Sequence, residues 1–166
     1  HMRTAWPSEQ PETHIGVFNG VYSNPDSLSW RWWDYSYSPV SNGMSVSHRQ
    51  RFGKFDVVTG GNALSDKTYL SVGHEQRLRA NVKFRYRASP LWQFGGGYQL
   101  QYQQMGRFIL WDDFVTNAYL PMDGTSSQDR WLNWHADAWA QFTPLSGGAH
   151  YFNARLYQTS RYGEDE

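Results

Sequence analysis

The 166-residue chain contains no cysteine. This absence excludes a disulfide-bonded scaffold, a thiolate metal site and a cysteine nucleophile. The chain has no excess of charge of either sign, since 15 basic residues balance 15 acidic ones, and overall charge therefore does not favour a nucleic-acid partner. Long apolar runs are missing too. The longest, Phe108-Ile109-Leu110-Trp111, is far short of the roughly 20 residues that a transmembrane helix needs.

What the chain does have is aromatic residues, at 17% with 9 Trp and 11 Tyr, in a pattern of alternation with a period of two. From Arg77 to Ala88, cationic or amide side chains alternate with apolar ones. Successive side chains of a strand point to opposite faces, so this stretch predicts a strand with one cationic and one apolar face. Ser89-Pro90-Leu91 predicts a turn, and the alternation resumes from Trp92 to Gln103. The two arms predict a β-hairpin.

Other stretches repeat the pattern. A second clear hairpin is expected from Leu132 to Phe142 and from Tyr151 to Tyr157, and a weaker one from Ser45 to Phe52 and from Phe55 to Gly60. Further strands are expected at His14–Tyr22 and Ser27–Tyr37. Long connections are expected at about 61–69 and 106–129. No stretch has a helical period long enough to predict a helix.

Short turns alternating with long connections, and arms of about 11 residues, favour a transmembrane β-barrel, whose strands need roughly 9–11 residues to cross the bilayer. The sequence therefore predicts an all-β, antiparallel up-and-down barrel of about eight strands. The barrel domain is expected over 13–160, after a flexible segment 1–12 that begins with a His1-Met2 tag remnant and before a polar tail 161–166. A soluble β-barrel or β-sandwich stays open as an alternative, because periodicity does not say which face lies inside.

Two segments carry a family resemblance. Residues 30–87 read WRWWDYSYSPVSNGMSVSHRQRFGKFDVVTGGNALSDKTYLSVGHEQRLRANVKFRYR, and residues 108–127 read FILWDDFVTNAYLPMDGTSS. The chain resembles, over about 13–160, the barrel of Bacteroidetes-type TonB-dependent outer-membrane receptors, with their "SHxxRFG" and "ExRxRxNxxFRYR" strands. The final hairpin, with His150 and Arg155, resembles the following strand pair of that family.

The resemblance implies a bacterial outer-membrane protein. Its parent would import a siderophore, haem, cobalamin, a glycan or a peptide, coupled to TonB and associated with a surface lipoprotein. The direct partner would be a lipid bilayer or detergent, with no nucleic acid. Nothing in the chain resembles the family's plug domain or TonB-contacting segment, and large transporters have about 22 strands. The isolated chain is therefore expected to be structural, without transport activity. The alternatives are a soluble barrel that binds a small apolar ligand or glycan and, less favoured, a small barrel enzyme acting on lipid.

The cationic row of the strand at 77–88 is the most distinctive charged feature. A lumen-facing ladder that steers an anionic cargo is one interpretation. We favour the other, an interior ion-pair network, because an unpaired buried charge is costly. Acids such as Asp137 and Glu75 are the expected partners. The members of this lumen charge network are Arg77, Arg79, Lys83, Arg85, Arg87 and Asp137.

Aromatic and acidic residues outside the strands supply candidate ligand contacts. Trp30 and Trp33 belong to a tryptophan-rich stretch that suits sugar stacking or, in the favoured interpretation, an interfacial girdle. Trp111-Asp112-Asp113 is a second candidate, in a long connection. The six His have no close pair at metal-ligand spacing, so no metal site or other cofactor is expected. No nucleophile elbow or phosphate-binding glycine loop occurs, and we expect no enzymatic activity.

Overall fold

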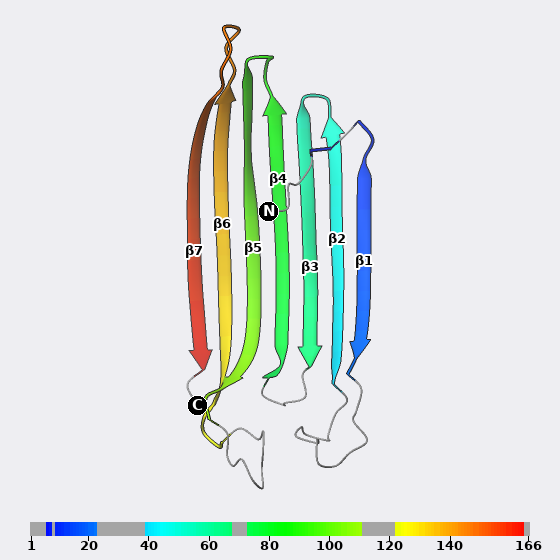
Figure 1. Ribbon diagram of the computed structural model, residues 1–166, viewed down its shortest axis with the longest axis vertical. Helices are drawn as coiled ribbons and strands as arrows, with labels where there is room; N and C mark the ends of the chain where they lie inside the picture. Colours follow the sequence, from blue (N-terminus) through cyan, green and yellow to red (C-terminus); the bar gives the residue numbers. More distant parts are fainter. Residues whose placement is uncertain (1–5, 8, 23–38, 68–72, 111–121, 165–166) are drawn as a thin grey trace.

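The computed structural model describes residues 6–7, 9–22, 39–67, 73–110 and 122–164, and it places seven antiparallel strands in one sheet (Figure 1). The strands are β1 (Glu12–Val21), β2 (Val40–Phe52), β3 (Phe55–Lys67), β4 (Glu75–Arg87), β5 (Trp92–Phe108), β6 (Ser126–Phe142) and β7 (His150–Glu164). Each strand pairs with the next one in the chain. The all-β, up-and-down prediction is confirmed. Within these ranges, no helix is long and apolar enough to cross a membrane.

The sheet is open, whereas the sequence predicted a closed barrel of about eight strands. β1 pairs only with β2, and β7 pairs only with β6, so these two strands are the edges of the described sheet. The alternation of side chains determines the two faces of a sheet but not its curvature, and closure depends on curvature. The strand expected at Ser27–Tyr37 lies outside the described residues. β1 and β2 pair directly, so no strand lies between them.

The strands are longer than the sequence predicted. Gly61–Lys67 was expected in a loop, but it is the second half of β3 and pairs with Val40–Val46. The expected connection at 106–129 is shortened from both ends, because β5 continues to Phe108 and β6 begins at Ser126. β7 continues to Glu164, beyond the start of the expected tail. Polar residues and glycines extend these strands because ladder hydrogen bonds join backbones and need no apolar side chains.

Three short turns lie together at one end of the sheet, and we call this end the turn end (Figure 1). The β2–β3 turn consists of Gly53 and Lys54, and Gly53 has a φ of 60° that favours glycine. In the β4–β5 turn, the Ser89 hydroxyl oxygen accepts hydrogen bonds from the backbone N–H groups of Leu91 and Trp92, at 3.2 and 3.1 Å. The opposite ends of the strands lie at the other end of the sheet, which we call the loop end (Figure 1). The short turns agree with the sequence prediction.

A glycine run in β5 leaves room for the Trp139 side chain of β6 to pack on the backbone of β5. A Cβ atom at Gly95 would lie 2.4 Å from Cζ2 of Trp139 and 2.6 Å from the carbonyl oxygen of Phe84. The indole of Trp139 therefore lies on the backbone of β5, where a side chain would otherwise stand. This close approach explains why glycine is found in the middle of a strand, where it otherwise weakens the sheet.

The sheet has almost no buried hydrophobic core. Val58 is the single buried hydrophobic residue among those described, and the chain exposes 11916 Å² to solvent. A compact protein of 19.4 kDa would expose about 8,500 Å². This sheet is a surface whose apolar side chains are not covered by any described part of the chain.

Candidate functional site

The register divides the sheet into two chemically distinct faces. Even-numbered residues of β1 and β3 share one face with odd-numbered residues of the other strands, and this is the polar face. The remaining strand residues form the apolar face. Most of the exposed large hydrophobic side chains lie on the apolar face, including Ile15, Met44, Leu78, Val82, Tyr98 and Leu156.

The apolar face carries a band of aliphatic and aromatic side chains across the middle of the strands. On β5 the band runs from Trp92 to Tyr102, and on β6 it runs from Leu132 to Phe142. Each stretch spans about 33 Å along the strand, at about 3.3 Å per residue. Towards the loop end the band gives way to polar residues, namely Gln76, Gln104, Gln128 and Arg130.

Aromatic side chains collect on the apolar face near the turn end. The ring centroid of Trp92 lies 4.7 Å from that of Phe142 and 5.7 Å from that of Phe94. The rings of Phe55 and Phe84 are stacked at 6.1 Å. We call the whole set the aromatic row: Phe52, Phe55, Phe84, Tyr86, Trp92, Phe94, Phe142 and Phe152. The row crosses the sheet from β2 to β7 at the edge of the apolar band.

The side chains of the expected charge network lie on the polar face, and two of them, Arg85 and Arg87, meet an acid that the sequence pattern did not indicate. Asp56 is fully buried. Its Oδ1 accepts from Arg51 Nε at 2.8 Å, and its Oδ2 accepts from Arg85 Nε at 2.8 Å. Arg87 Nη2 lies 3.4 Å from Oδ1. Three guanidinium groups therefore share one carboxylate, and this is the Asp56 cluster. The predicted hairpin at 45–60 brings Asp56 opposite Arg51, but the pairing of Asp56 with Arg85 needs the β3–β4 register, which the sequence pattern does not predict.

The rest of the cationic row on β4 has other partners. Arg77 lies 3.7 Å from Glu75, one of the two acids that the sequence suggested. Arg79 Nε donates to the side-chain oxygen of Gln101 at 2.8 Å. A Cβ atom at Gly97 would lie 3.1 Å from Oδ1 of Asp137 and 3.3 Å from Cγ of Lys83. Lys83 and Asp137 thus reach over the same glycine, which brings the second suggested acid to the row.

Trp6 and Pro7 pack on the polar face, over the Asp56 cluster. Pro7 is fully buried, and its carbonyl oxygen accepts from Arg51 Nη2 at 2.8 Å. The guanidinium of Arg85 lies 4.5 Å from the ring centroid of Trp6, and Trp6 lies 6.5 Å from Trp139. A cation–π contact of this kind shields the cluster from water.

A second buried acid lies on the polar face near the loop end. Asp129 accepts from Arg161 Nη2 at 2.9 and 3.0 Å, and it lies 3.4 Å from Arg107 Nε. The guanidinium of Arg107 lies 4.8 Å from the ring of Trp131. Both ends of the polar face thus combine a buried aspartate with arginines and a tryptophan.

His74 directly precedes β4. Burial of its side chain, together with the positive charge of Lys67, lowers the pKa of His74.

The candidate ligand contacts Trp30, Trp33, Trp111, Asp112 and Asp113 lie outside the described residues. Within the described ranges, no group of three or more His, Asp or Glu residues is arranged to hold a metal ion. The groups that the structure does bring together are ion pairs and amides on one face and hydrocarbon on the other. No protein-family model, curated protein or solved structure matches this chain.

Proposed function

We propose that the chain is part of an outer-membrane β-barrel in which the apolar face contacts lipid and the polar face lines the interior. The observation that carries the proposal is the uncovered apolar band with its aromatic row. Strands tilted by about 40° would reduce a band of about 33 Å along the strand to about 25 Å along the membrane normal, the height of the lipid-facing belt of such barrels. Rows of aromatic residues border that belt at the membrane interfaces.

The family resemblance extends the proposal to the parent protein. That protein would import a nutrient, namely a siderophore, haem, cobalamin, a glycan or a peptide, with energy from TonB and with help from a surface lipoprotein. The seven strands would supply a wall of its barrel and carry out no catalytic step. By themselves they would be structural, because the ion pairs on the polar face hold the strands together and form no path for a cargo.

The absence of cysteine makes a direct test simple. Val82 and Asn81 are neighbours on β4, and they lie on the apolar and the polar face. Val82→Cys and Asn81→Cys would each be labelled with an environment-sensitive fluorophore, in vesicles that contain spin-labelled lipids. We expect lipid quenching of the label at position 82 and little quenching at position 81.

The soluble alternative predicts a different result. A soluble β-barrel or β-sandwich would cover Val82 with protein, and the chain would remain folded and monomeric in buffer without detergent. Lipid would then quench neither label. Observing this behaviour would reject the membrane proposal and favour a binding protein for a small apolar ligand or glycan.

A further inference from the structure

A pocket on the polar face near the turn end is lined by aromatic rings and amide side chains, and we call it the aromatic pocket. Its volume is about 370 Å³, within the range of about 300–1,000 Å³ that small-molecule sites occupy. Most of its lining belongs to two adjacent rows of the register, Gln93–Gln141–Tyr151 and Gly95–Trp139–Asn153. Trp6 lines it as well. The aromatic pocket therefore lies on the face that the proposed function turns to the barrel interior.

The two indoles of the aromatic pocket are held in place by the chain itself. Trp139 lies on the backbone of β5 at Gly95, and the ring of Trp6 lies 4.5 Å from the guanidinium of Arg85. The centroids of the two indoles are 6.5 Å apart, and their planes are inclined at 56°. Side chains that are already fixed lose little conformational freedom on binding, so these rings form a preorganised surface for the apolar face of a ligand.

Hydrogen-bonding groups surround these rings. Gln141 donates to the Thr143 hydroxyl oxygen at 3.1 Å, whereas the side chains of Gln93, Tyr151 and Asn153 have no hydrogen-bond partner within the described part of the chain. An amide side chain both donates and accepts, as does a hydroxyl group. A ligand that carries several hydroxyls would pair with this set, whereas a purely apolar ligand would cover the amides and leave them unsatisfied, at a cost in free energy.

The charge of the aromatic pocket favours a neutral ligand. Arg85 is the one charged residue among the described residues that line it, and Arg85 Nε already donates to Asp56 Oδ2 at 2.8 Å. The positive charge is therefore balanced by a buried carboxylate and does not call for an anion. A neutral ligand with an apolar face and a rim of hydroxyls fits the lining best. A pyranose sugar has this construction, because C–H groups form the faces of its ring and hydroxyls project from its edge.

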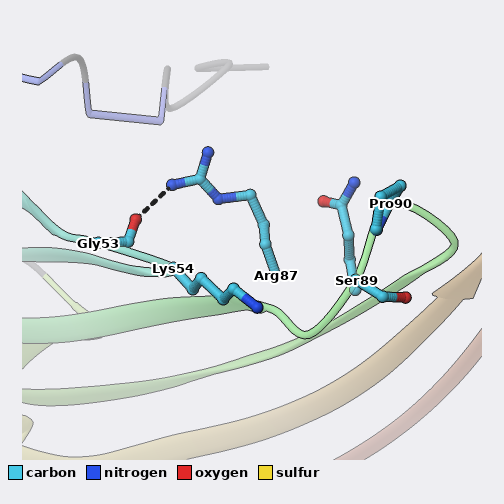
Figure 2. A pocket seen from close by; sticks show the side chains of 6 residues that line it. Gly53, Lys54, Arg87, Ser89 and Pro90 are labelled. Atoms are coloured by element: carbon cyan, nitrogen blue, oxygen red, sulfur yellow. Dashed lines mark hydrogen bonds between the residues drawn. The ribbon is translucent and has the colours of Figure 1, made fainter.

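A neighbouring groove, between the β2–β3 turn and the β4–β5 turn, lacks such a surface. It shares Gln93 with the aromatic pocket, and its described lining includes Lys54 and Arg87 but no aromatic residue. Figure 2 shows both cations at this groove, where Arg87 Nη2 donates to the Gly53 carbonyl oxygen at 2.9 Å. The rings that could stack on a sugar are found in the aromatic pocket and not in this groove.

We propose that the aromatic pocket binds one pyranose ring of a neutral sugar, with the ring stacked on an indole and its hydroxyls bonded to Gln93, Tyr151 and Asn153. The inference rests on the proposed function and deepens it, because it selects a glycan among the candidate cargoes and gives it a site at the turn end. In a barrel of about 16 or more strands the interior is an aqueous lumen, through which a dissolved sugar reaches the polar face. A further strand beside β7 would pair with its backbone in the plane of the sheet, so the polar face of β5 and β6 would stay open.

The test uses the full chain in lauryldimethylamine oxide, a detergent without a sugar headgroup, and saturation-transfer NMR to measure ligand binding. The probes are the methyl pyranosides of glucose, galactose and mannose, methyl glucuronoside, and tetrahydropyran-2-methanol, which keeps the ring and lacks the ring hydroxyls. We expect saturable binding of at least one neutral pyranoside, with the strongest transfer to its ring C–H protons. Tetrahydropyran-2-methanol should bind at least about tenfold more weakly, since the loss of one or two hydrogen bonds weakens affinity by about this factor.

Variants identify the pocket. Trp139→Ala should weaken binding of the pyranoside by about tenfold or more, and Tyr151→Ala and Gln93→Ala should each weaken it by about fivefold. The matched controls are Tyr157→Ala and Gln99→Ala, because these residues lie on the same strands and the same face, further towards the loop end. Both controls should leave binding unchanged. The Trp139 variant would be checked for folding by circular dichroism. Tyr151 is 70% exposed, so its replacement leaves the fold intact and keeps the test decisive.

Three results would overturn the inference. The first is a folded chain that binds none of the neutral pyranosides, and the second is binding that Tyr151→Ala and Tyr157→Ala weaken equally. The third is tighter binding of methyl glucuronoside or of tetrahydropyran-2-methanol than of every neutral pyranoside, which would identify a site for an anion or for an apolar ring. None of these results would change the quenching expected of labels at Val82 and Asn81, so a failure here is distinct from a failure of the membrane proposal.

Discussion

Replacing the acid of the Asp56 cluster should produce the largest loss of stability among the polar-face substitutions. Asp56→Asn keeps the size of the side chain and removes its charge, which leaves three guanidinium groups facing one another. Removing one partner of a buried ion pair costs about 3–5 kcal/mol. The side chains of Arg85, Arg51 and Arg87 retain 16%, 24% and 32% of their exposure. Water screens them in part, and we therefore expect about 3 kcal/mol, the lower end of that range.

The measurement is the free energy of unfolding in urea, followed by tryptophan fluorescence of the chain in detergent micelles. Asp123→Asn is the control, because Asp123 is exposed in the turn before β6 and its substitution should change stability by less than about 0.5 kcal/mol. In the Asp56→Asn background, Arg85→Gln should cost less than it does in the unchanged chain, since it then relieves repulsion. Equal losses for Asp56→Asn and Asp123→Asn would refute the view that the buried carboxylate organises the polar face.

Three further substitutions test other parts of the sheet by the same urea unfolding. Gly95→Ala should lower the free energy of unfolding by about 1–3 kcal/mol, because the new Cβ would collide with the backbone of β4. Gly20→Ala should be tolerated, because the nearest atom to its new Cβ lies at 3.7 Å. Equal losses of stability for the two variants would disprove the close approach at β5. In lipid vesicles, Val82→Arg should lower the free energy of unfolding by about 2–4 kcal/mol, and Asn81→Arg should change it little. A larger loss of stability for Asn81→Arg than for Val82→Arg would contradict a lipid-facing apolar band. Burial lowers the pKa of His74, so the unfolded chain takes up the proton more readily and stability should fall as the pH drops below about 6.5. The fall from pH 8 to pH 5 should be smaller in His74→Gln, and identical pH profiles would rule this effect out.

The faces of the sheet could be predicted from the sequence because alternation in a strand has only two outcomes. The arms 77–88 and 92–103 were predicted within a few residues of β4 and β5, and their turn was located by Ser89-Pro90-Leu91. Once one strand of a hairpin is assigned, the register transfers its faces to the next strand. The cationic row of β4 was therefore correctly separated from the apolar residues between its members.

The Asp56 cluster could not be recognised in the same way. The polar face of β3 mixes Val58, Gly60 and Leu64 with Asp56, Asn62 and Asp66, so the alternation around Asp56 is weak. Its importance comes from two neighbouring strands that bring Arg51 and Arg85 to it from opposite sides. Contacts of this kind depend on the pairing of three strands, which periodicity within one strand does not contain.

The lengths of the strands were underestimated for a related reason. The segment 61–67 contains glycine and polar residues that are depleted in strands, and this composition predicts a loop. In the structure it continues β3, because β2 and β4 pair with it on both sides. Pairing with two neighbours outweighs a weak local preference, whereas the sequence pattern reports only the local preference.

The number of strands constrains how this sheet can be completed in a membrane. Because consecutive strands are antiparallel, β1 and β7 run in the same direction (Figure 1). Joining these two edges directly would create a parallel pair, so a strictly antiparallel closure needs an odd number of further strands between them. Lipid does not tolerate unpaired backbone groups at a sheet edge. If the apolar face contacts lipid, β1 and β7 must therefore each pair with a strand that is not among the seven described. This requirement agrees with a wall of a larger barrel. It disagrees with a barrel made of these seven strands alone.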